Sequence, residues 1–82
     1  MLYLSLTGGA ALSLLALPGW ERERVSDALV LLTADPRPPF ARRLEDLPGE
    51  RYEIWVGERR VVYGVFKDDS GSDLMVVVFR VI

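Results

Sequence analysis

Hydrophobic and polar positions alternate with a period of two along residues 51–67, RYEIWVGERRVVYGVFK. This is the period of a β-strand with one covered face. A reversal is expected at Gly57 and Glu58, because glycine tolerates the positive φ that many tight turns need. The stretch therefore predicts a β-hairpin. Its core face is expected to hold Tyr52, Ile54, Val56, Val61, Tyr63 and Val65. Its open face is expected to hold Arg51, Glu53, Trp55, Arg60, Val62, Gly64 and Phe66.

Two more strands are predicted, one at each end of the chain. Residues 1–6 alternate leucines with Tyr3 and Ser5. Residues 73–82 are apolar on both faces, which is typical of a strand inside a sheet. The proline-rich connector over 35–50 is expected to hold one helical turn around residues 41–46. Two leucines of the connector are expected to close the edge of the core, Leu44 and Leu47.

Two helices are expected between the first strand and the connector. The first covers residues 10–17 behind Thr7, which is a good N-cap. Ser13 is its only polar residue, so a second apolar face is either shielded by neighbouring elements or available to another chain. The second helix covers residues 20–34, and Trp20 is expected to pack at its start. Its core face follows the helical spacing of Val25, Ala28, Leu29 and Leu32.

The order β-α-α-β-β-β predicts an α+β fold in which two N-terminal helices pack on a four-stranded antiparallel sheet. The length of 82 residues predicts a single domain, 1–82. The chain has no cysteine and no histidine, which excludes zinc sites built from those ligands and catalysis by serine–histidine or cysteine–histidine pairs. We therefore expect neither a metal nor a cofactor.

The apolar run near the N-terminus is too short to span a bilayer, and no basic residue precedes Arg22 as a signal peptide requires. We therefore expect a cytoplasmic protein with no membrane partner. The net charge of −2 does not favour indiscriminate binding to nucleic acid.

An ordered set of segments resembles a known family. The set comprises the opening strand, the two helices, Asp35-Pro36-Arg37, Arg43-Leu44, Leu47-Pro48-Gly49, Tyr52-Glu53-Ile54, residues 56–63 and residues 77–81. It is similar to the RelE/ParE superfamily of toxin–antitoxin toxins. The resemblance implies a toxin that a cognate antitoxin neutralises in a hetero-oligomer. RelE-like members cut messenger RNA on the ribosome, whereas ParE-like members inhibit DNA gyrase and have no nuclease site.

In the RNA-cutting branch, the resemblance matches Arg60 to the arginine that binds the scissile phosphate. A guanidinium is always charged and offers paired donors to phosphate oxygens. Glu53 and Trp55 stand where RelE-like nucleases carry two lysines. The sequence ends at Ile82, before the basic stretch that follows the last strand in many members.

The candidate catalytic residues are therefore Arg60, Glu53 and Arg80. The carboxylate of Glu53 is a candidate base, although nearby arginines should lower its pKa. We expect RNA or partner contacts at Arg51, Trp55, Phe66 and Arg43, and antitoxin contacts at Leu12, Leu14 and Leu15. On the open face, Arg51, Arg60 and Arg80 are expected to surround Glu53.

Three functions remain open at this point. The first is ribosome-dependent cleavage of messenger RNA, the second is inhibition of gyrase, and the third is a degenerate toxin that only binds its antitoxin. A solvated sheet face joined by arginine–glutamate pairs would suit the third. Tyr63 is expected to be a core residue whose hydroxyl lies near an edge.

Overall fold

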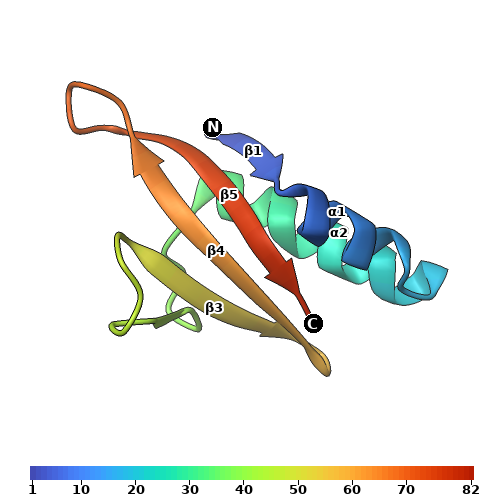
Figure 1. Cartoon of the computed structure of the whole chain (residues 1–82). Helices are drawn as coiled ribbons and strands as arrows, with labels where there is room; N and C mark the ends of the chain where they lie inside the picture. Colours follow the sequence, from blue (N-terminus) through green and yellow to red (C-terminus); the bar gives the residue numbers. More distant parts are fainter.

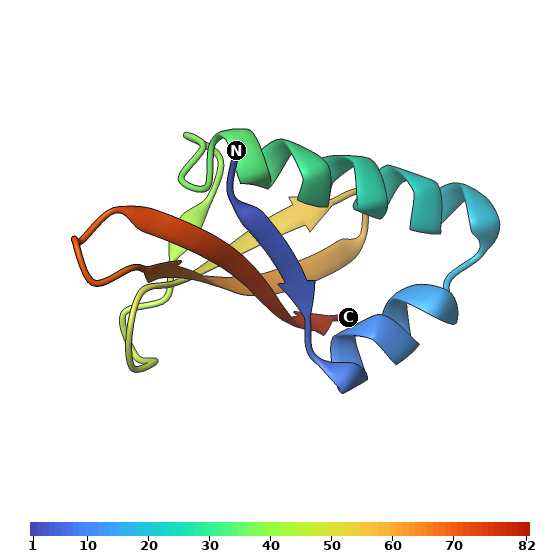
Figure 2. The same ribbon diagram turned by 90° about the horizontal axis from the view of Figure 1, so that it is seen from above.

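Both helices pack on one face of a five-stranded sheet, and the opposite face is uncovered (Figures 1 and 2). The structure is a computed structural model that describes residues 1–82. In chain order the elements are β1 (Tyr3–Leu6), α1 (Gly8–Leu15), α2 (Gly19–Ala34), β2 (Arg42–Arg43), β3 (Arg51–Val56), β4 (Arg59–Lys67) and β5 (Asp73–Val81). Neither helix is long and apolar enough to cross a membrane.

The sheet has the strand order β1-β5-β4-β3-β2. β1 runs parallel to β5, with Leu4 beside Val76, and all other neighbours are antiparallel. The expected four-stranded antiparallel sheet is therefore wrong in strand number and in the direction of β1. Alternation along a strand shows which side chains share a face, but it does not reveal which partner the strand takes or in which direction.

The expected helical turn around residues 41–46 is also wrong. Arg42 and Arg43 form β2 and pair with Glu53 and Tyr52 at the edge of β3. The free edge of β3 supplies hydrogen-bonding partners to these two residues, which favours a strand over a helical turn. Leu47 is exposed rather than part of the core, whereas Leu44 is buried as expected.

The central hairpin is confirmed. β3 and β4 are joined by Gly57 and Glu58, and Gly57 has a φ of +62°. The residues predicted for the core face lie in one cluster with both helices or, for Val56, pack against it. The hydroxyl of Tyr63 donates to the carbonyl oxygen of Pro36 at 2.7 Å, which confirms a core tyrosine that reaches an edge.

Helix α1 begins and ends two residues earlier than expected. Its N-cap is confirmed, because the Thr7 hydroxyl accepts a hydrogen bond from the Ala10 backbone at 3.2 Å. Leu14 is partly buried and packs against the core, and its expected contact with an antitoxin stays a prediction. Leu12 and Leu15 are 71% and 65% exposed, so the neighbouring elements shield only one side of this helix.

Helix α2 lies where it was predicted. Val25, Leu29 and Leu32 are buried in the core and Ala28 packs against them. Trp20 does not pack as expected but is largely exposed. The side chains of α2 therefore supply most of the helical half of the core.

Substitution of Leu29 by alanine should lower the free energy of unfolding by about 2–5 kcal/mol, since this side chain is only 2% exposed and its removal leaves a cavity. Leu31, on the same helix, is 67% exposed, and Leu31→Ala should stay within about 0.5 kcal/mol of the wild type. Chemical denaturation followed by circular dichroism measures both. Equal losses for the two variants would contradict the placement of α2.

Candidate functional site

A groove of about 530 Å³ crosses the uncovered face of the sheet. It combines four arginines with two acids and three apolar side chains. The lining residues are Arg42, Arg43, Leu44, Glu45, Asp46, Leu47, Arg60, Val62 and Arg80. They come from β2, from the segment that follows it, and from β4 and β5. The groove is open and positively charged, so it suits an anionic ligand.

A buried carboxylate orients two of these arginines. Glu53 is 5% exposed, although it lies on the uncovered face. Its Oε1 accepts a hydrogen bond from Nε of Arg42 at 2.7 Å, and its Oε2 accepts one from Nε of Arg60. The hydrogen bond from Arg42 and then that from Arg60 hold the pKa of Glu53 below its ordinary value. Glu53 is therefore ionised at neutral pH and is a weak base.

Arg60 lies on β4 opposite Trp55, as the alternation predicted. Its only side-chain hydrogen bond uses Nε, which leaves both terminal nitrogens available to a ligand. Arg80 lies on β5 opposite Val62 and makes no ion pair within the protein. The structure thus brings Arg60 and Arg80 into one groove and places Glu53 at its side. Trp55 is exposed at the end of the same face.

The expected arrangement around Glu53 needs one correction. Arg51 does not join it, because its guanidinium lies over the rings of Phe66 and Phe79. Arg42 takes the second place beside Glu53. The sequence gives no local signal for this pair, since it depends on the pairing of β2 with β3.

The guanidinium of Arg43 lies 5.9 Å from the centre of the Tyr52 ring, and its Nε is 3.9 Å from the Glu45 carboxylate. These contacts leave Arg43 partly exposed at the rim of the groove. No group of acidic side chains in the structure could hold a metal ion.

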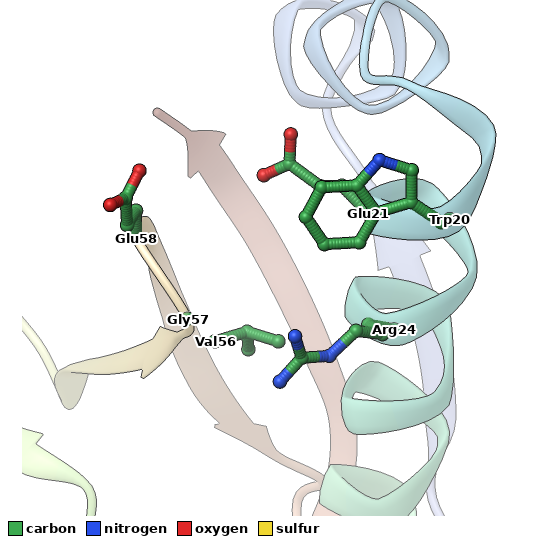
Figure 3. A pocket seen from close by; sticks show the side chains of 6 residues that line it. All are labelled: Trp20, Glu21, Arg24, Val56, Gly57 and Glu58. Atoms are coloured by element: carbon green, nitrogen blue, oxygen red, sulfur yellow. The ribbon is translucent and has the colours of Figure 1, made fainter.

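A second pocket, of about 310 Å³, lies between the start of α2 and the turn from β3 to β4 (Figure 3). Its lining comprises Trp20, Glu21, Arg24, Val56, Gly57 and Glu58. Glu21 makes a two-point ion pair with Arg59, with distances of 2.6 Å to Nε and 2.8 Å to Nη2. Two carboxylates and one arginine line this pocket, so it does not share the positive charge of the groove.

Two solved structures from E. coli are similar to the chain. One is the intact RelBE toxin–antitoxin complex, with 25% identity and a TM-score of 0.80 over 99% of this chain and 94% of that chain. The other is a mutant of the toxin RelE in the free state, with 26% identity and a TM-score of 0.76 over 98% of this chain and 80% of that chain. The chain belongs to the RelE/ParE toxin superfamily.

The archaeal RelE–RelB complex from Pyrococcus horikoshii has the same fold as this RelE/ParE toxin, with a TM-score of 0.79 and 18% identity over 98% of this chain and 91% of that chain. No family model and no curated protein sequence matches the chain. The likeness is therefore carried by the three-dimensional arrangement more than by sequence.

The role that the resemblance implies for Arg60 stays a prediction, and the surroundings of this residue suit it. Arg60 is accessible, lies in a groove and is held from one side. The two positions where the resemblance implies lysines hold an ionised, paired Glu53 and an exposed indole. The guanidinium donors of the groove suit an anionic ligand such as a phosphate, but the paired, ionised Glu53 is not a strong base.

The stability of the protein should fall in acid partly because of Glu53. A folded-state pKa below the ordinary value of about 4.3 adds stability above that pH, and this stability is lost as the pH falls through the folded pKa. Melting temperatures measured from pH 3 to pH 7 should drop at the acid end. The Glu53→Gln variant should melt lower at pH 7 and show a shallower drop in acid. If the melting temperature of this variant fell as steeply in acid as that of the wild type, Glu53 could not be ionised and paired in the folded protein.

Proposed function

We propose that the chain is the toxin of a toxin–antitoxin pair and that it cleaves messenger RNA on the ribosome, with Arg60 as the phosphate-binding residue. The observation that carries the proposal is the arginine groove on the uncovered face of a RelE-like fold. Arg60 offers two free terminal nitrogens in that groove. We propose a cytoplasmic location, because that is where ribosomes and messages are found.

The chemistry that suits this groove is attack of a ribose 2′-hydroxyl on the adjacent phosphorus. A bond forms between the 2′-oxygen and phosphorus, the bond to the 5′-oxygen breaks, and the products are a 2′,3′-cyclic phosphate and a 5′-hydroxyl. Negative charge grows on the phosphate oxygens, and the guanidinium groups of Arg60 and Arg80 stabilise it. The proton of the 2′-hydroxyl passes to water, since Glu53 is a weak base, and the leaving 5′-oxygen takes a proton from water to become the 5′-hydroxyl. Glu53 acts as a positioning residue that fixes Arg60 and Arg42.

Inhibition of DNA gyrase is a second candidate function, and one observation favours it. Glu53 is locked in two hydrogen bonds and its pKa is lowered, so the groove lacks an efficient proton acceptor. A gyrase inhibitor needs a binding surface and no acid or base.

We propose that the antitoxin covers the outer side of α1. Leu12 and Leu15 are three residues apart, so they share one face of the helix, and both are exposed. The similar structures from E. coli and P. horikoshii are complexes of RelE with RelB. An amphipathic antitoxin helix would bury these leucines against its own apolar side chains.

Expression of the chain without an antitoxin should arrest growth and produce cut messages, which primer extension detects. Arg60→Ala should reduce cleavage by about 10²–10³-fold, because it removes the N–H donors that stabilise the negative charge developing on the phosphate oxygens. Arg60→Lys should retain part of the activity, since it keeps the charge but loses the paired donors. Arg24→Ala removes an exposed charge from α2 and serves as the control.

The same cultures separate the alternatives. Growth arrest with intact messages and gyrase-linked DNA breaks would show that the chain inhibits gyrase and does not cleave messenger RNA. Growth without arrest, from a protein that circular dichroism shows to be folded, would favour the degenerate toxin.

The Leu12→Glu/Leu15→Glu double variant should bind its antitoxin at least about a hundredfold more weakly, because each of the two buried leucines contributes more than about 1.4 kcal/mol. Calorimetry with the protein encoded by the adjoining gene measures the change. Val30→Glu alters an exposed apolar residue on α2 and is the matched control. Full affinity in the folded double variant would exclude the outer side of α1 as the antitoxin surface.

A further inference from the structure

Arg51 has an unusual environment on the open face of the sheet. Its guanidinium carbon lies 4.4 Å from the centre of the Phe79 ring and 5.1 Å from that of Phe66. A Cβ placed on Gly64 would lie only 2.7 Å from Nη1 of Arg51, and one on Gly49 would lie 3.1 Å away. Two aromatic rings and two glycines therefore make room for a flat guanidinium lying against the sheet.

No acid neutralises this guanidinium. The Glu50 carboxylate binds Arg37 at 2.6 Å and Tyr52 at 3.0 Å. The Glu53 carboxylate binds two other arginines. The acids on either side of Arg51 in the sequence are thus occupied, and the Arg51 side chain makes no hydrogen bond or ion pair with the protein. Its N–H donors are left for solvent or a ligand.

A shallow hollow of about 370 Å³ adjoins Arg51. Its lining comprises Pro48, Gly49, Glu50, Arg51, Val65, Phe66 and Lys67. Lys67 adds a second positive charge, 3.8 Å from a Glu50 that already binds Arg37. The side chain of Phe66 is partly exposed at the edge of the hollow. A charged planar donor beside an accessible aromatic ring is the combination that binds a phosphate and a base of single-stranded nucleic acid.

The hollow at Arg51 and the groove at Arg60 lie on the same open face, a few residues apart along β4. Arg51 pairs with Gly64 across β3 and β4, and Gly64 is four residues from Arg60 on β4. Four residues of a strand span about 13 Å, which is more than one nucleotide covers. Between them the open face presents Val62 and the neutralised Glu53, which do not repel a polyanion.

We infer that Arg51 forms a second phosphate subsite, so that a single RNA strand runs along the sheet from the Arg60 groove to the Arg51 hollow. This subsite rests on the proposed RNA function and gives the bound strand a direction across the sheet. Arg51 binds a backbone phosphate at a different nucleotide from the one held by Arg60. The exposed part of Phe66 stacks against a base of the same segment.

The test uses the purified chain and two 2′-O-methyl RNA probes. These probes cannot be cleaved, because the methyl group blocks the 2′-oxygen that would attack the phosphate. One is a dinucleotide with a single phosphate, and the other is a hexanucleotide. Fluorescence anisotropy at several salt concentrations gives the affinity and its salt dependence. Arg51→Met keeps the aliphatic stem over the rings and removes the charge, and Arg24→Met removes the same charge from α2.

Arg51→Met should bind the hexanucleotide about tenfold more weakly and lower the slope of log K against log salt by about 0.7, the value for one phosphate on a single strand. Its binding of the dinucleotide should be unchanged. Arg24→Met should match the wild type with both probes. Circular dichroism melts show whether each variant is folded.

The possible results separate this subsite from the function on which it rests. Equal hexanucleotide affinity and salt slope in wild type and Arg51→Met would overturn the Arg51 subsite and leave the proposed function intact. An equal loss with both probes would also overturn it, since Arg51 would then act through the groove. A wild-type protein that binds neither probe would overturn the Arg51 subsite, whereas the RNA function itself fails if expression of the chain leaves the messages intact.

Discussion

The two helices bury one face of the sheet and leave the other to solvent, so the open face must be held together without an apolar layer. Charged and aromatic side chains perform that task. Glu53 joins β3 to β2 and β4 through two arginines, and Arg51 spans the rings of Phe66 and Phe79. A carboxylate so nearly enclosed is tolerated because both of its oxygens accept hydrogen bonds from cations. The same contacts that stabilise this face also determine which arginines keep free donors.

Four arginines of this protein illustrate two kinds of surroundings. Arg37 and Arg59 make two-point contacts with carboxylates, and these contacts join segments distant in sequence: the connector to β5, and the hairpin to the start of α2. Arg60 and Arg51 are held from one side and keep donors free. A protein with a net charge of −2 can in this way present a positive surface. Its carboxylates pair with some arginines and lie away from the free donors of others.

The sequence predicted most reliably those features that depend on local periodicity. The faces of the central hairpin, the core face of α2 and the Thr7 cap are all visible in short windows of sequence. Features that depend on distant partners were missed. β2 exists because β3 offers it an edge, and without β2 the pairing of Arg42 with Glu53 cannot be foreseen. An almost wholly apolar helix gives no clear indication of which side faces inward, so the packing of Leu14 against the core was not foreseen.

The parallel pairing of β1 with β5 affects how the protein is made. Leu4 lies beside Val76, and the hydroxyl of Thr7 donates to the carbonyl oxygen of Phe79, a separation of 72 residues. β1 can therefore take its place in the sheet only after β5 has been synthesised. Contacts of such long range in sequence slow folding, because the entropy of closing the loop is lost before the contacts form. The sheet thus stays incomplete in any nascent chain that stops short of β5.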